Sequence, residues 1–212
     1  MSHDTFCTAL TYDTENKPAG IYIVKRELFE SLNPEKPTDM TEDIIHEAVK
    51  SGEAVLLDGK GYYKRITTPE AFLDCQRHML YNENMSQRLT ENNFSGAAIG
   101  EPVYIGENVS VMSGSVIESG SVIDNNAVVK GGKVNGYVGI GSVVSERCDI
   151  NSAVVCRGAV LDSGVKCGEY SVIGEKAHIA SEAVIEKGVG IWSGKTVEKG
   201  VRPVSYTHLR AH

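Results

Sequence analysis

The sequence predicts a mainly β protein in which a parallel β-helix fills the second half of the chain and follows a smaller α/β segment. An aliphatic residue recurs at every sixth position, and a small or short apolar residue follows it four positions later, with a clear exception only at Lys195. Glycine or an acidic residue often comes directly after the aliphatic one, where the backbone must turn. The recurring positions, one of them a cysteine, are Ile99, Ile105, Val111, Ile117, Ile123, Val129, Val155, Leu161, Cys167, Ile173, Ile179, Ile185, Ile191 and Val197.

The six-residue period has a simple structural meaning. Six residues make one short strand and a bend, and three such units close a triangular coil of about eighteen residues. The aliphatic side chain points inward and stacks on its equivalents in the neighbouring coils, whereas the small residue lies near a corner. A period of six fits neither the 3.6-residue α-helix nor the 3.5-residue coiled coil. An ordinary β-sandwich is the alternative, but it does not predict so strict a spacing.

The period is lost between Val129 and Val155. The inward candidates in this interval are Val138 or Ile140, Val144 and Ile150. The residues Gly131, Gly132, Asn135 and Gly136 predict a small loop pushed out of the coil. Such an insertion is either a functional feature of one face or a tolerated surface bulge.

The first ninety residues predict a small α/β arrangement. We expect a buried strand at residues 20–24, a short helix at 26–32, a helix over 42–50 that Thr41 caps and Gly52 ends, and a strand at 54–57. A further helix begins near Pro69 and runs towards Leu80. Either Thr67 caps it with Glu70 as partner, or Thr68 caps it with Pro69 in first place.

Composition excludes several functions. A net charge of −7 argues against nucleic acid as a partner. The sequence has no run of eighteen apolar residues and no signal peptide at its start, so we expect no membrane partner and a cytoplasmic location. The five cysteines lack metal-ligand spacing. Cys148 and Cys167 fall on inward positions and are expected to be reduced core residues.

The last nine residues, 204–212, end the repeat abruptly after Pro203. They look like the translation of a sequencing-library adapter, and we expect the natural chain to continue with other residues after about Pro203. His208 and His212 are therefore not taken as candidates for any site.

The order of elements resembles the end of the catalytic domain of sugar-phosphate nucleotidyltransferases, followed by their hexapeptide-repeat left-handed β-helix. The resemblance rests on Gly20-Ile21-Tyr22-Ile23, on Gly61-Tyr62-Tyr63 with Ile66-Thr67-Thr68-Pro69-Glu70-Ala71-Phe72, and on the β-helix. Residues 189–195 are most similar to the mannose-1-phosphate guanylyltransferases. The resemblance divides the chain into a catalytic-domain remnant (1–81), a connector (82–98), the β-helix (99–203) and a non-native tail (204–212).

The resemblance implies a role in nucleotide-sugar synthesis from a sugar 1-phosphate and a nucleoside triphosphate. These two compounds would be the partners of the parent protein, and Mg²⁺ its cofactor. It implies that Gly20, Tyr22 and Arg65 contribute to the sugar-side wall of the site. It also implies that the β-helix forms a homo-oligomer. No catalytic residue, metal ligand or cofactor site is expected in this chain itself.

The chain departs from that family in ways that affect activity. The glycine-rich phosphate loop and the first metal-binding aspartate are absent, and Arg65 stands where the family has a second Mg²⁺-binding aspartate. An arginine has only donors and cannot bind a cation, whereas Mg²⁺ requires oxygen ligands. Arg65 could bind phosphate directly, or Lys64 and Arg65 could form a solvated turn. We expect a fragment or degenerate member that makes no nucleotide sugar alone.

Two functions from other classes stay open. Many hexapeptide-repeat proteins are acyltransferases, which need a general-base histidine at an interface between rods. His178 is the only histidine between residues 99 and 203, and its other interpretation is an exposed corner residue. The chain could instead be a non-catalytic regulatory or assembly subunit, with Trp192 as a surface contact.

Overall fold

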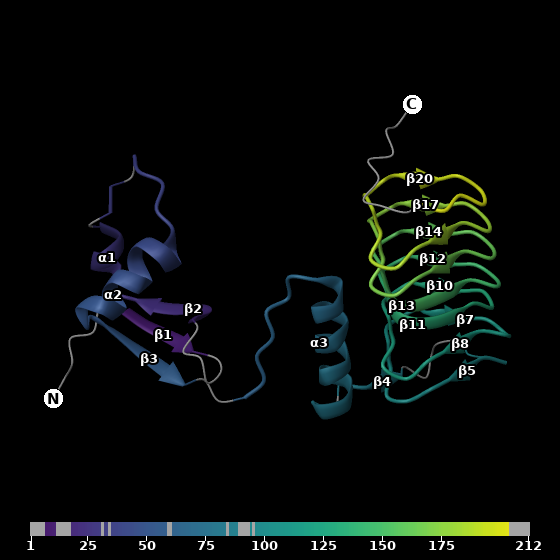
Figure 1. The fold of residues 1–212 in the computed structure, drawn as a ribbon. Helices are drawn as coiled ribbons and strands as arrows, with labels where there is room; N and C mark the ends of the chain where they lie inside the picture. The colour runs from purple at the N-terminus through teal and green to yellow at the C-terminus, as the bar shows by residue number, and fades with distance from the viewer. Residues whose placement is uncertain are drawn as a thin grey trace. The chain divides into compact units, whose positions relative to one another are not determined.

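A computed structural model describes residues 7–11, 18–30, 32–33, 35–58, 61–83, 85–88, 94 and 96–203. The chain divides into two compact units, residues 1–65 and 66–212, and each is described by itself (Figure 1). The tail at 204–212, with His208 and His212, lies outside the described residues, and so does the prediction about its origin.

The first unit contains a three-stranded sheet in the order β2-β1-β3. Its strands are β1 (Cys7–Thr11), β2 (Pro18–Val24) and β3 (Ala54–Asp58); β1 pairs antiparallel with β2 and parallel with β3. The helical segments are α1 (Arg26–Glu30), the π-helical η1 (Met40–Ile45) and α2 (His46–Ser51). Ile45 and Ala48 are buried and pack against Tyr22 and Val24 of β2.

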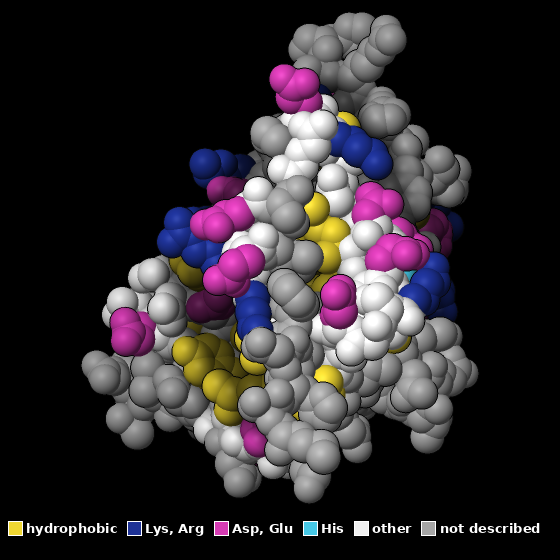
Figure 2. All heavy atoms as spheres, turned by 90° about the vertical axis from the view of Figure 1, so that its left-hand side faces the viewer, with side chains coloured by type: hydrophobic (Ala, Val, Ile, Leu, Met, Phe, Trp, Pro, Cys, Tyr) yellow, Lys and Arg dark blue, Asp and Glu magenta, His cyan; other side chains and the backbone are white. Residues whose placement is uncertain are grey.

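The predicted burial of the strand at 20–24 is wrong for half of its side chains. Ile21 is 47% exposed and Ile23 is 65% exposed, and Val55 and Leu57 on β3 are also exposed. Successive side chains of a strand point to opposite faces. The helical segments of this unit cover the face that carries Tyr22 and Val24, so the alternate residues stay open. Hydrophobic side chains are visible at the surface among charged ones in Figure 2.

The helical cap in this unit also differs from the prediction. Asp39, not Thr41, caps the segment: its Oδ1 accepts from the backbone N–H groups of Thr41 at 2.8 Å and Glu42 at 2.9 Å. A carboxylate at this position satisfies two N–H groups that have no partner in the first turn. The predicted end at Gly52 is confirmed, because Gly52 has the left-handed φ of 78°.

The second unit is a β-helix whose parallel strands form three faces. The first face holds β7 (Ser110–Val111), β10 (Val128–Val129), β12 (Val143–Val144), β14 (Val160–Leu161), β17 (His178–Ile179) and β20 (Thr196–Val197). The second face holds β5 (Ala98–Ile99), β8 (Val116–Ile117), the start of β11 (Lys133–Val138), the start of β13 (Asp149–Val155), β15 (Lys166–Cys167) and β18 (Val184–Ile185). The third face holds β4 (Gln87–Arg88), β6 (Tyr104–Ile105), β9 (Val122–Ile123), the ends of β11 and β13, β16 (Val172–Ile173) and β19 (Gly190–Ile191).

The core of the β-helix is the stack of inward residues that the period predicts. Ile105, Ile123 and Ile173 are fully buried, and the cysteines at inward positions, Cys148 and Cys167, are 2% and 1% exposed. Three of the buried serines at the small positions donate to nearby carbonyls, as where Ser142 Oγ donates to the Cys156 carbonyl at 2.8 Å, whereas the Ser171 hydroxyl has no partner among the described residues. A parallel β-helix of hexapeptide repeats is thus confirmed as the main architecture.

The predicted loop between Val129 and Val155 is wrong, because residues are missing there rather than added. Eighteen residues separate the paired positions Ile105 and Ile123, but only fifteen separate Ile123 and Val138. β11 and β13 run without a break from the second face to the third, which removes the usual corner. The residues that keep the core filled in this interval, all fully buried, are Val134, Val138, Val144 and Ile150.

Gly136 makes this short corner possible. Its φ is +146°, and the position of a Cβ atom would meet the backbone of Ala153 on the next coil, 3.0 Å from the nitrogen and closer still to the carbonyl oxygen. The register between β11 and β13 shifts at this point. Only a residue without a side chain allows the two strands to approach so closely.

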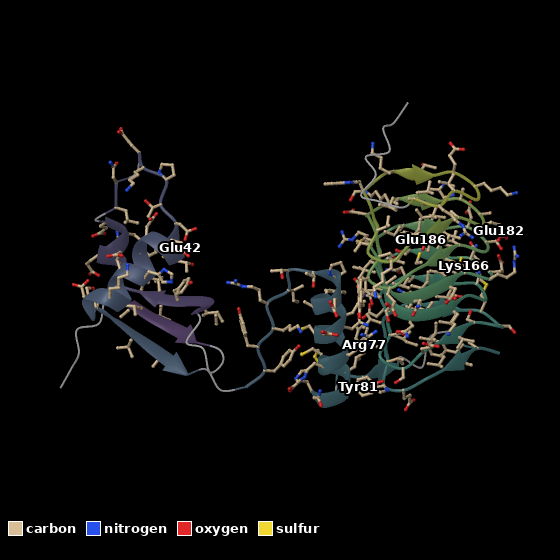
Figure 3. All side chains as sticks on the ribbon, in the orientation of Figure 1. Glu42, Arg77, Tyr81, Lys166, Glu182 and Glu186 are labelled. Atoms are coloured by element: carbon tan, nitrogen blue, oxygen red, sulfur yellow. The ribbon has the colours of Figure 1, made fainter. Side chains whose placement is uncertain are left out.

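Helix α3 (Pro69–Asn82) packs on the short corner and the third face. Gln76 Nε2 donates to the carbonyls of Gly120 at 2.7 Å and Gly136 at 3.1 Å, and Arg77 Nη2 donates to Ser152 Oγ at 3.0 Å. Arg77 and Tyr81 reach from the helix towards the β-helix in Figure 3. The unit boundary at residue 65 therefore places α3 with the β-helix, whereas the sequence placed it with the α/β remnant.

The structure decides between the two possible caps of α3. Thr68 Oγ1 accepts from the Ala71 N–H at 3.1 Å, with Pro69 in the first helical position. We expect Thr68→Ala to lower the free energy of unfolding by about 1 kcal/mol, measured by urea denaturation. Thr67→Ala is the matched control, and its effect should stay within about 0.5 kcal/mol. Equal losses in the two variants would contradict this assignment.

Candidate functional site

His178 and Asp162 form a hydrogen-bonded pair on the first face of the β-helix. His178 Nε2 lies 2.9 Å from Asp162 Oδ2. The two side chains are 46% and 37% exposed, so both remain accessible to solvent. Imidazole paired with carboxylate is an arrangement suited to proton transfer.

The repeat explains why these two side chains meet. His178 precedes the inward residue Ile179 and therefore points outward, in register with Val160 of the preceding coil. Asp162 follows the inward residue Leu161, where the strand of that coil ends. Because stacked coils are about 4.8 Å apart, an outward histidine can reach a carboxylate on the coil before it.

A second polar cluster fixes the corner that carries Asp162. Arg147 Nη2 lies 2.9 Å from Glu182 Oε1 and 3.3 Å from Ser163 Oγ, and Ser163 Oγ also donates to the Glu146 carbonyl at 3.0 Å. These contacts join three successive coils next to Asp162. In Figure 3, Glu182 and Lys166 lie at the side of the β-helix away from α3.

The outward strand positions around His178 carry no other charge on its face. The outward residues of the six first-face strands are Ser110, Val128, Val143, Val160, His178 and Thr196. The second face differs, since Lys133, Asp149 and Lys166 point outward there. His178 is therefore the one titratable side chain at these outward positions of the first face.

The hydrogen bond to Asp162 defines what the imidazole can do. A carboxylate only accepts, so the hydrogen-bond network assigns the proton to Nε2 of a neutral His178. The lone pair of Nδ1 then remains, and within the described part of the chain Nδ1 has no hydrogen-bond partner. This tautomer can take a proton from a bound nucleophile.

The three residues predicted to line a sugar site lie in the first unit. Gly20 has a φ of +79°, and its missing Cβ would lie 2.9 Å from Arg65 Nη2, so the structure brings these two together. Tyr22 instead turns towards η1, where its hydroxyl is 2.9 Å from Thr41 Oγ1. Tyr63, which was not among the predicted site residues, donates to the Ala19 carbonyl beside Gly20.

Neither a metal-binding cluster nor a membrane-spanning helix is found among the described residues. No group of three or more histidine, cysteine, aspartate or glutamate side chains in those ranges could hold a metal ion. None of the helices that the structure describes is long and apolar enough to cross a membrane.

The thiols of the β-helix are not activated. Burial raises the pKa of Cys148 to about 11, and burial also raises the pKa of Cys167 and Cys156. Cys148 is further held by its contact with the Asp162 carbonyl, 3.0 Å from Sγ. A nucleophilic cysteine needs a lowered pKa, so we assign these thiols a structural role.

The raised pKa of Cys148 has a consequence for stability. Unfolded thiols lose their proton near pH 9, whereas Cys148 in the folded chain keeps its proton up to about pH 11. The folded state then binds more protons, so we expect stability to fall between pH 9 and 11, by at most about 1.4 kcal/mol per pH unit for this thiol. Urea denaturation across this range should show a shallower slope for Cys148→Ala. An unchanged slope would contradict the assignment.

Comparisons with known proteins give matches only among solved structures. No family model matches the chain, and no curated protein matches it. PerB from Caulobacter crescentus, solved with CoA and GDP-perosamine, is 24% identical with a TM-score of 0.30, over 53% of this chain and 51% of PerB. The acetyltransferase domain of PglB from Neisseria gonorrhoeae is 19% identical with a TM-score of 0.32, over 73% and 84%. LpxA from Acinetobacter baumannii is 11% identical with a TM-score of 0.37, over 56% and 68%.

These matches correct the functional interpretation of the sequence. The chain spans about half the length of the PerB structures that it matches. The structures found include acetyltransferases and a hexapeptide transferase, and they lend no support to a nucleotidyltransferase segment. The interpretation as a fragment or degenerate member of the sugar-phosphate nucleotidyltransferases is therefore wrong, and the sugar-phosphate and nucleotide partners lose their basis. The hexapeptide repeat occurs in both classes, which explains how the resemblance misled.

Proposed function

We propose that this chain is a hexapeptide-repeat acyltransferase in which His178 is the general base and Asp162 positions it. The observation that supports this function best is the 2.9 Å hydrogen bond between His178 Nε2 and Asp162 Oδ2, on a face where the other outward strand residues are uncharged. The donor would be an acyl thioester such as acetyl-CoA, and the acceptor an amine or a hydroxyl group.

The geometry supports a direct transfer. His178 Nδ1 takes the proton of the acceptor as its nitrogen or oxygen attacks the carbonyl carbon of the thioester. A bond forms between the acceptor and the acyl carbon, and the carbon–sulfur bond then breaks. The protonated imidazole gives its proton to the departing thiolate. Asp162 stabilises the imidazolium during this exchange and keeps the ring in the productive tautomer.

A second copy of the chain would complete the site. His178 and Asp162 are open to solvent in one chain, whereas acyl transfer is favoured where water is excluded. The flat row of Val128, Val143 and Val160 beside His178 suits contact with another rod. We expect a homo-oligomer with the acceptor bound between the two surfaces.

The proposal is tested by measuring thiol release. The chain is incubated with acetyl-CoA and separate panels of amines, amino sugars and sugar alcohols, and free CoA thiol is followed with time. We expect release that depends on one class of acceptor and saturates with its concentration. Release no faster than in buffer with every acceptor, together with no acetyl-CoA binding by calorimetry, would overturn the proposal.

A further inference from the structure

An open groove of about 650 Å³ lies on the third face of the β-helix, at coils further along the chain than those that α3 contacts most closely. Ligand sites in proteins have volumes in this range. Its floor is formed by Val172 and the backbone of Gly190, and Trp192 stands at its edge. This groove lies on a different face from the His178 pair, so ligand binding there is independent of acyl transfer.

The groove exists because one coil lacks an outward side chain. Gly190 is in register with Val172 on the third face, and the coil before that carries Val154 at the same position. A glycine there leaves a hollow beside the ring of Trp192, which is 58% exposed. A large exposed aromatic side chain next to a hollow is typical of a binding surface.

Three polar residues form a ladder along the same corner. The inward residues Val155, Ile173 and Ile191 are in register on successive coils. The ladder consists of the residues two positions after them, which are Arg157, Glu175 and Ser193. The backbone bonds from Lys176 N to the Arg157 carbonyl at 2.9 Å and from Gly194 N to the Glu175 carbonyl at 2.7 Å hold these coils together. The three side chains are exposed and about 4.8 Å apart per step.

The charges of the ladder are available to a ligand. Among the described residues, the Arg157 guanidinium makes no hydrogen bond or ion pair. Within the same part of the chain, the one ion pair of the Glu175 carboxylate is with Lys176, at 3.8 Å, an exposed pair that contributes little. On successive coils, the groove is thus lined by the aromatic ring of Trp192, the carboxylate of Glu175 and the guanidinium of Arg157.

We propose that this groove binds an acidic oligosaccharide. The apolar face of one pyranose ring lies on Trp192, and hydroxyl groups of the chain donate to the Glu175 carboxylate. A carboxylate of a neighbouring sugar accepts two hydrogen bonds from Arg157, the geometry that guanidinium prefers. The coil spacing is close to the length of one sugar unit, and a groove that is open to solvent accommodates a chain that continues beyond it.

The single tryptophan of the chain allows a direct test, since its fluorescence reports on this groove alone. The full chain is titrated with an oligogalacturonate and with a neutral maltooligosaccharide of equal length. We expect a saturable change in tryptophan fluorescence with both saccharides. The acidic saccharide should bind about tenfold more tightly than the neutral one at low salt. Arg157→Gln should remove this difference without changing the neutral affinity, and Arg26→Gln, at an exposed arginine of the first unit, should leave both affinities unchanged.

A second variant fills the hollow and spares every polar group. Gly190→Val introduces the residue type found at this position on the two preceding coils, so the fold should be retained. We expect the valine side chain to weaken the binding of both saccharides more than tenfold. Wild-type affinity in Gly190→Val, equal affinity for acidic and neutral ligands, or a response to AMP but to neither saccharide would overturn the proposal. The last result would assign the groove to nucleotides.

Discussion

Replacing His178 with glutamine should lower the rate of acyl transfer by about 10²- to 10⁴-fold, the usual contribution of a general base. Glutamine keeps a polar group near Asp162 but cannot take up a proton. The thiol-release assay measures the effect at saturating acetyl-CoA, so that a loss of donor binding is separated from a loss of chemistry. A variant that retains the wild-type rate would remove His178 from the mechanism.

Two further variants sharpen this result. Asp162→Asn should reduce the rate by a smaller factor, about 10- to 100-fold, because the base remains but its tautomer and orientation are no longer held. His46 is a matched control, since it is also an exposed histidine beside a carboxylate, with Nδ1 3.1 Å from Glu42 Oε2. His46→Gln should leave the rate unchanged if the effect belongs to the β-helix site.

Substitution of Gly136 by alanine should cause the largest loss of stability among single glycine replacements, about 3–5 kcal/mol. The added methyl group would meet the nitrogen, carbon and oxygen of Ala153, all backbone atoms of a paired strand that cannot rotate away. The φ of +146° adds strain for any residue with a side chain. Urea denaturation monitored by circular dichroism measures the loss.

Gly141 provides the comparison for that experiment. It also has a positive φ, of +66°, but no atom of the described residues lies within 4 Å of its missing Cβ. Gly141→Ala should therefore cost only the backbone term, about 1–2 kcal/mol. If the two variants lose equal stability, close strand approach at the short corner is not what requires Gly136.

The β-helix could be predicted from sequence because its core is encoded locally. Each inward residue is followed six positions later by the next, so counting alone places Ile123 or Ile173 inside and His178 outside. The short corner could not be predicted the same way. Glycines such as Gly132 and Gly136 occur both in loops that leave a coil and in strands that approach each other closely. Only the fold tells which of these two structures is present.

The α/β unit shows a different limit. Ile21 and Ile23 are as apolar as core residues, and a short apolar run does not tell whether one face of a strand is covered or both. The choice between Thr67 and Thr68 as cap also needed the structure, because both satisfy the sequence rule. Asp39 was missed although aspartate is a preferred cap, since the prediction began the helix two residues too late.

The candidate site was half visible in the sequence. His178 stood out as the single histidine of the repeat, but Asp162 is sixteen residues away and was not singled out. The coil length provides the signal that could have found it. A side chain is adjacent to those roughly one coil before it, so a search at separations of sixteen to eighteen residues pairs His178 with Val160 and Asp162.

The two carbonyl contacts of Gln76 limit how this protein can change in length. A β-helix is modular, and a complete coil can be inserted between two others without altering the cross-section. Gln76, however, spans Gly120 and Gly136, which belong to consecutive coils, so an insertion between them would separate its two acceptors. Coils beyond β16 carry no such bridge from Gln76. We therefore expect growth or shortening by whole coils to be tolerated towards β20, and the part bound to α3 to keep a fixed number of coils.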